Sequence, residues 1–108
     1  MTLDDIKQAV EEANSIVILT HENPDGDAIG SSLAVYNALI ALGKEPEMII
    51  PEYPAIYSFL PSADKIQKEG TRKVYDLAIS VDSSDIKRLN GFANYFEQAK
   101  TTINIDHH

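Results

Sequence analysis

Three short apolar segments of this chain each run directly into side chains that can bind a metal ion. The segments cover residues 15–20, 76–81 and 101–105. The polar residues after these segments, our candidate site residues, are His21, Asp25, Asp27, Asp82, Asp106, His107 and His108. Imidazole and carboxylate groups without a thiol suit hard or borderline divalent cations, Mn²⁺ first, with Mg²⁺, Co²⁺ or Zn²⁺ as further possibilities.

These side chains are more numerous than one metal ion needs. Two ions about 3.5–4 Å apart are the usual arrangement for such a set, sharing a bridging carboxylate and an activated water. Such a pair holds the attacking and the leaving oxygens of a phosphoryl group. The residue types therefore predict a two-metal site for phosphoester hydrolysis.

The elements that must position these residues form a predicted α/β fold. Residue patterns predict helices over 2–13, 27–42 and 92–98 and strands over 15–20, 47–50, 76–81 and 101–105. The proline-rich segment 51–61 is predicted as an irregular crossing with a helical turn around 56–59. Strands that alternate with helices predict an open, mostly parallel sheet with flanking helices.

The predicted sheet explains how residues far apart in sequence can meet. In an open parallel sheet, ligands bind outside the carboxyl ends of the strands, at the point where the strand order reverses. The segment 15–20 is almost entirely apolar and rich in β-branched residues, as expected of a strand buried on both faces. Because each polar group comes directly after a strand, we expect the three groups to converge at one edge.

Length and composition limit the class of protein. The 108 residues fit one small domain with a single core, and the net charge of −8 argues against a polyanion held by the overall field of the domain. The chain has no cysteine, which excludes disulfides and thiolate metal sites. No apolar run approaches the roughly 20 residues of a membrane span, and the N-terminus lacks the layout of a signal peptide. We therefore expect a cytoplasmic protein with no membrane partner.

Each candidate also has a structural explanation. Asp27 is a good N-cap for the predicted helix over 27–42, and residues 24–26 alone form a turn. Asp82 and Asp85 could simply open a loop and cap a helix turn, and we assign Asp85 to this structural role. His107 and His108 at the chain end could begin a purification tag. The convergence of three strand ends weakens these explanations considerably.

Two serines near the start of the helix over 27–42 have two interpretations. The hydroxyl groups or backbone donors of Ser31 and Ser32 could meet a phosphate. A place on the helix surface is the equal alternative.

Other nucleotide-binding and catalytic motifs are absent. Gly26 and Gly30 lack the dinucleotide-binding spacing, and Gly43-Lys44 is followed by Glu45, which excludes a P-loop. The chain contains neither a GxSxG elbow nor a cysteine nucleophile.

Three segments resemble the first three motifs of the DHH-family phosphoesterases. They are THENPDGDAIGS from residue 20, VDSSD from residue 81 and IDHH from residue 105, in the family's order. The forms PDGDAIGSSLA and FLPSADKI are more similar to the nano-RNase and pAp-phosphatase branch than to the inorganic pyrophosphatases. The resemblance covers nearly the whole chain and implies the Rossmann-like fold of a DHH domain.

The resemblance implies a role for each candidate residue. His21 and Asp25 would hold one Mn²⁺ ion, Asp27 and His107 the second, and Asp82 would bridge the two. In addition, His108 would lie over the substrate phosphate, polarising it or assisting the leaving group, and Asp106 would orient a neighbouring ligand. The implied reaction is hydrolysis of short oligoribonucleotides or of adenosine 3′,5′-bisphosphate by an activated water.

One departure from the family pattern concerns the C-terminal end of the sequence. The family has a fourth motif, a further metal-binding Asp well after the third, and a smaller C-terminal domain that makes much of the contact with RNA or nucleotide. Neither is present in these 108 residues. We therefore expect this chain to be the N-terminal portion of a longer protein. A homodimer is a separate expectation for its assembly.

Other functions remain open at this point. A cyclic-dinucleotide phosphodiesterase or an inorganic pyrophosphatase would use the same motifs. A non-catalytic module that binds nucleotide or metal is a third alternative, and the intact motifs argue against it, because such a module need not keep Asp25, Asp27 and Asp82.

The missing fourth motif generates a prediction about metal binding. We expect the 108-residue chain to bind Mn²⁺ weakly and to turn over substrate poorly, because the second ion lacks one of its carboxylates. Isothermal titration calorimetry with Mn²⁺ measures the binding directly. Two tight sites in the 108-residue chain would contradict the expectation of an incomplete site.

Overall fold

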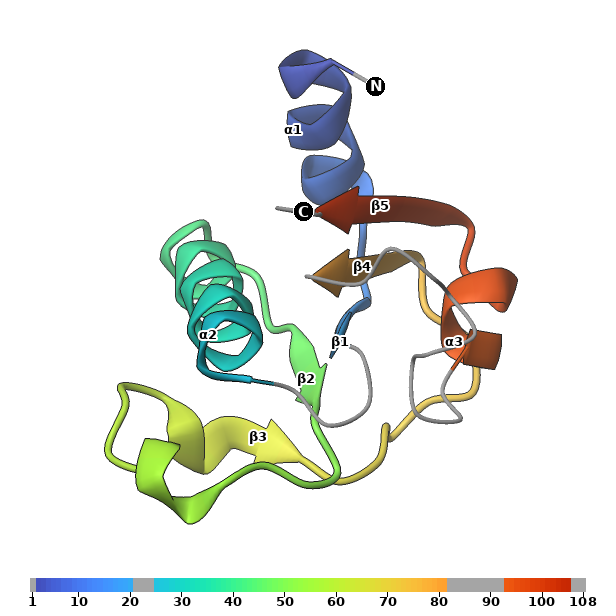
Figure 1. Ribbon diagram of the computed structural model, residues 1–108. Coiled ribbons are helices and arrows are strands. Elements are labelled where there is room, and N and C mark those ends of the chain that lie inside the picture. The colour runs from blue at the N-terminus through green and yellow to red at the C-terminus, as the bar shows by residue number, and fades with distance from the viewer. Residues whose placement is uncertain (1, 21–24, 82–92, 106–108) are drawn as a thin grey trace.

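The computed structural model describes residues 2–20, 25–81 and 93–105 and shows a five-stranded sheet whose described pairings are all parallel (Figure 1). The strand order is β3-β2-β1-β4-β5. The strands are β1 (Ile16–Thr20), β2 (Glu47–Ile49), β3 (Ile66–Gln67), β4 (Leu77–Val81) and β5 (Thr101–Ile105). The helices are α1 (Leu3–Glu12), α2 (Gly26–Ala41) and α3 (Ala93–Gln98), with 3₁₀ turns η1 (Ala55–Tyr57) and η2 (Ala63–Lys65). The α/β fold with an open parallel sheet is confirmed.

Helix α1 begins and ends through specific hydrogen bonds. Thr2 and Asp5 form a capping box, in which each side chain accepts the backbone N–H of the other residue. At the other end, the Lys44 ammonium group donates to the carbonyl oxygens of Glu11 and Ala13, at 3.0 Å each. These carbonyls lack partners within the helix, so Lys44 links α1 to the turn before β2.

Helix α2 begins one residue earlier than predicted, and this corrects the predicted cap. Its N-cap is Asp25, whose side chain accepts the N–H of Ala28, and Asp27 lies within the first turn. The helix ends where Gly43 adopts φ +83°, as expected of a glycine that terminates a helix. Ser32 is fully buried and donates to the carbonyl oxygen of Ala28. The hydroxyl of Ser32 is therefore neither on the helix surface nor accessible to a phosphate.

The sheet is covered on both faces, and its strands β1 and β4 are almost entirely apolar. One face packs against α1 and α2, with Ile16 and Ile18 of β1 in that cluster. The other face packs against α3, with Val17 and Leu19 in the second cluster. Every residue of β1 and β4 is buried, as predicted for a strand enclosed on both sides.

Strand β3 was not predicted. It has only two residues and pairs with β2 at the outer edge of the sheet. Its residues Ile66 and Gln67 are half-buried, and a pair of residues is too short to give a readable pattern. The other predicted elements agree with the structure to within one or two residues over its described part. Among the described residues, no helix is long and apolar enough to cross a membrane.

A polar cluster fixes the chain between β3 and β4. Tyr75 is buried, and burial raises the pKa of its hydroxyl to about 12. That hydroxyl accepts the N–H of Arg72 at 3.3 Å. Glu47 accepts hydrogen bonds from the backbone N–H and the hydroxyl of Thr71, at 2.8 and 2.7 Å. Within this cluster, a Cβ on Gly70 would overlap the Tyr75 hydroxyl and lie 3.2 Å from Ile49 Cδ1.

The close approach at Gly70 predicts opposite effects for two glycine substitutions. Gly70→Ala should lower the free energy of unfolding by about 1–3 kcal/mol, because the added methyl group displaces the Tyr75 ring. Gly30→Ala is the matched control, because it adds a methyl group to α2 where, apart from the nearby backbone of the helix itself, no described atom lies within 4 Å. It should raise that free energy by about 0.5–1 kcal/mol. Denaturant unfolding measures both, and equal effects would contradict the packing at Gly70.

Candidate metal centre

The three strands that precede the candidate residues end in the same row of the sheet. Thr20 of β1 pairs with Val81 of β4, and Val81 pairs with Ile105 of β5. The next residues in the sequence are His21, Asp82 and Asp106, which lie outside the described part of the chain, as do His107 and His108. The predicted convergence of the strand ends is therefore confirmed, and the side-chain arrangement of these five residues stays a prediction.

The row lies where the strand order reverses. The chain places β2 and β3 on one side of β1 and β4 and β5 on the other. The carboxyl ends of β1 and β4 thus flank the position at which open α/β sheets bind their ligands. At this position the buried hydroxyl of Thr20 donates to the carbonyl oxygen of Val81, at 3.0 Å. This bond ties together the two residues that immediately precede His21 and Asp82.

Asp25 is held in place by its capping bond. Its Oδ1 accepts the Ala28 N–H at 2.9 Å, and the residue is exposed. A carboxylate has a second oxygen, so capping and metal binding are compatible roles for one aspartate. The capping role that the sequence predicted for Asp27 thus belongs to Asp25, and it leaves a functional role for Asp25 open.

Asp27 lies in the first turn of α2 and is exposed. It and Asp25 flank Gly26, so two carboxylates lie close together in the sequence at the start of the helix. In charge and exposure both fit a divalent cation with oxygen ligands. Across residues 2–20, 25–81 and 93–105, no group of three or more His, Cys, Asp or Glu side chains could hold a metal ion. A complete site thus needs the residues that come after the three strand ends.

One residue near the candidate centre was missed by the sequence prediction. A Cβ on Gly26 would lie 3.0 Å from Tyr57 Oη and 3.3 Å from Cε1 and Cζ of the same ring. Tyr57 therefore lies against the first turn of α2, at the glycine between the two candidate aspartates. The sequence signal for it was the concentration of aromatic residues within the proline-rich crossing over 51–61.

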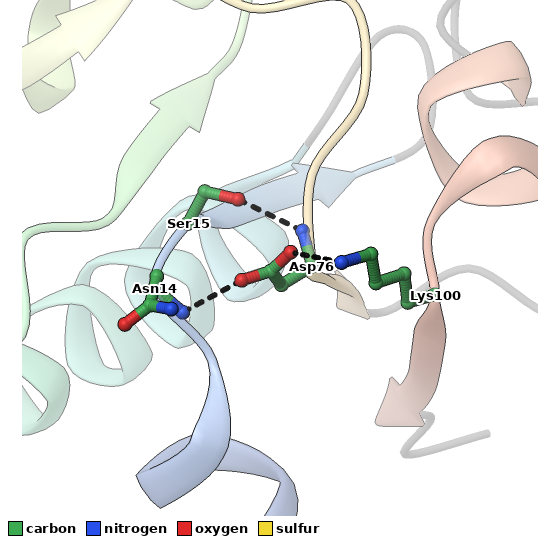
Figure 2. Close-up of polar contacts among 4 residues, drawn as sticks. All are labelled: Asn14, Ser15, Asp76 and Lys100. Carbon is green, nitrogen blue, oxygen red and sulfur yellow. Dashed lines mark hydrogen bonds and ion pairs between the residues drawn. The ribbon is translucent and has the colours of Figure 1, made fainter.

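A hollow of about 230 Å³ at the opposite edge of the sheet has a structural role. Figure 2 shows its main contacts: the Asp76 carboxylate accepts the Asn14 N–H at 2.8 Å and pairs with Lys100 at 3.4 Å, and the Asp76 N–H donates to Ser15 Oγ. The bond from Asn14 and the nearby ammonium group of Lys100 lower the pKa of Asp76. These bonds join the starts of β1, β4 and β5 and satisfy the charged groups locally. We therefore place the candidate centre at the carboxyl edge.

The chain is similar to known proteins in both sequence and structure. Residues 15–108 match the DHH family, N-terminal domain. Over 106 residues the chain is 39% identical to a bifunctional oligoribonuclease and PAP phosphatase, NrnA, of Thermus thermophilus, covering 96% of this chain and 30% of that protein. The crystal structure of an exopolyphosphatase-related protein from Bacteroides fragilis matches with a TM-score of 0.84 and 28% identity, covering 97% of this chain and 34% of that one. The chain thus spans about a third of the length of these relatives.

The bond between Thr20 and Val81 predicts a linked effect on stability and metal binding. Thr20→Val keeps the side-chain shape and should lower the free energy of unfolding by about 1 kcal/mol, because it removes a buried hydrogen bond. It should also weaken Mn²⁺ binding, because the strand ends beneath the candidate ligands loosen. Thr102→Val on β5 is the control, since no hydrogen bond from its side chain occurs among the described residues. Denaturant unfolding and Mn²⁺ calorimetry measure both effects; no difference between the variants would contradict this role of Thr20.

Proposed function

The chain belongs to the DHH family, and on that premise we propose that it forms the metal-binding part of a divalent-metal-dependent phosphoesterase. The observation that carries the proposal is the common row of strand ends, Thr20, Val81 and Ile105, each followed directly by a candidate ligand or catalytic residue. The substrates we propose are short oligoribonucleotides and adenosine 3′,5′-bisphosphate.

We assign the metal ligands from the family motifs. His21 and Asp25 would hold one Mn²⁺ ion, Asp27 and His107 would hold the other, and Asp82 would be shared between them. The row of strand ends supports this assignment, because Asp82 comes after the strand that lies between β1 and β5. A central position is what a bridging ligand requires.

The chain's own residues then position and neutralise the reacting groups. When bound, the two metal ions would polarise the phosphoryl group and lower the pKa of an attacking water. The Ala28 N–H fixes the Asp25 carboxylate through its Oδ1. His108 contacts the substrate phosphate and stabilises the leaving oxygen, while Asp106 orients the adjacent imidazole.

The substrate class is inferred from charge and from the relatives. The domain has a net charge of −8, which disfavours a long polyanion bound along its surface. A single phosphodiester or a terminal phosphate needs only the local attraction of the cations. The similarity to a bifunctional oligoribonuclease and PAP phosphatase supports this choice. A cyclic dinucleotide or pyrophosphate is the alternative substrate within the family.

The bridging role of Asp82 gives a mutational test. Asp82→Ala in the full-length protein should reduce hydrolysis of a dinucleotide by at least about a hundredfold, because both ions lose a shared ligand. Asp64→Ala is the control, since Asp64 is an exposed aspartate of η2 and should leave the rate unchanged. Steady-state assays on a dinucleotide, adenosine 3′,5′-bisphosphate and a cyclic dinucleotide, each with Mn²⁺, measure rate and preference together. Near-normal activity of Asp82→Ala, with the fold intact by circular dichroism, would refute the assignment.

A further inference from the structure

The connection between β2 and β3 leaves the sheet at the edge that carries the candidate centre. Strand β2 is parallel to β1, and Ile49 at its end pairs with Leu19, one residue before the end of β1. The connection therefore begins beside the residues that precede His21. It runs through η1, whose last residue is Tyr57, and Figure 1 shows this part of the chain near the start of α2.

Tyr57 brings a hydroxyl group to the first turn of α2. Its Oη lies 3.0 Å from the position of a Cβ on Gly26, which is the residue between Asp25 and Asp27. The ring is half-buried and packs against the core cluster on the α2 face. In the described part of the chain, the hydroxyl has no hydrogen-bond partner. Packing thus holds the ring, and no described residue occupies the hydroxyl.

Basic residues are scarce near this hydroxyl. The sequence has no lysine or arginine between Lys44 and Lys65. Most described basic residues that flank strands precede them: Lys44 before β2, Lys65 before β3, Arg72 and Lys73 before β4, and Lys100 before β5. Lys68, after the outermost strand, is the exception. Among the described residues near the start of α2, an anion therefore meets neutral donors, and a phenol is a neutral donor; Lys87 and Arg88, which come after β4 in the sequence, lie outside the described part of the chain.

We propose that the Tyr57 hydroxyl donates a hydrogen bond to a non-bridging oxygen of the substrate's phosphoryl group. The inference rests on the proposed function, because it places the phosphate beside Asp25 and Asp27. A carboxylate-rich centre repels a phosphate until its cations are bound, and a neutral donor adds attraction without competing for those carboxylates. Tyr57 is thus a substrate-contacting residue supplied by the β2–β3 connection.

A purely structural role for Tyr57 makes a different prediction. If the ring only packs against α2, phenylalanine performs the same task. The segment offers a matched control in Tyr53, which is also half-buried and packs against the same cluster. Tyr57→Phe and Tyr53→Phe each remove one hydroxyl from the same segment, and only the first removes it from beside Gly26.

The test compares these two variants in the full-length protein with Mn²⁺. We expect Tyr57→Phe to lower kcat/KM for a dinucleotide by about tenfold or more, because a hydrogen bond to a charged group is lost. Tyr53→Phe should match the wild type. Both variants should keep the wild-type melting temperature and Mn²⁺ affinity. A Tyr57→Phe variant that matches Tyr53→Phe in rate, or that loses melting temperature or Mn²⁺ affinity, would overturn the proposal.

Two substrates identify the atom that Tyr57 contacts. On a phosphorothioate dinucleotide the penalty of Tyr57→Phe should shrink in one diastereomer, because sulfur is a poor acceptor. On bis(4-nitrophenyl) phosphate, which lacks a nucleoside, the penalty should persist; its disappearance would assign the contact to the nucleoside and contradict the proposal. A wild-type protein that hydrolyses none of these substrates refutes the proposed function itself, whereas an active wild type with an unaffected Tyr57→Phe refutes only the inference.

Discussion

The register of β1 between its two neighbours is the constraint on which the rest of the structure depends. All five residues of β1 are buried, with Ile16 and Ile18 facing α1 and α2 and Val17 and Leu19 facing α3. A slip of one residue would exchange the two apolar sets and move the strand's end relative to β4. Because both faces are packed, the register is strongly specified. The same packing that stabilises the domain therefore fixes the row in which the strands end.

Burial on both faces confines polar side chains to the two ends of the strands, here called the amino edge and the carboxyl edge, and these two edges differ. At the amino edge, charged groups satisfy one another: Asp76 joins Asn14 to Lys100, and Lys44 caps α1. At the carboxyl edge near α2, Asp25 and Asp27 are exposed, and among the described residues neither forms an ion pair. Structural bonds thus hold the strand starts, while the strand ends carry the groups that a ligand can reach.

The sequence predicted the strand ends because buried parallel strands have a distinctive apolar pattern, and most of the fold is determined by them. The sequence prediction was wrong at the start of α2, where two aspartates could each serve as the N-cap, and it missed β3, which is too short to give a pattern. Asp25 and Asp27 are both good caps, and the choice between them depends on where α2 begins. Strand β3 has only two residues, which pair with β2 at the outer side of the sheet. Ser32 comes three residues after Ile29 and four before Tyr36, so helical spacing already placed it on the buried face. Tyr57 reaches Gly26 through a connection without periodicity, and only the folded chain shows that contact.

The distribution of charge explains why the carboxyl edge needs cations. The chain has seventeen acidic and nine basic residues, and two of the lysines, Lys44 and Lys100, are engaged at the amino edge. Within the described part of the chain, a phosphate that approaches Asp25 and Asp27 therefore meets carboxylates before it meets a positive side chain. In the proposed centre, bound divalent ions would reverse the sign of the potential, and the Tyr57 hydroxyl would add a hydrogen bond without using a metal ligand. If the proposed function is correct, an acidic domain with this layout would attract a phosphoryl group only after it has bound metal, so metal binding would precede substrate binding.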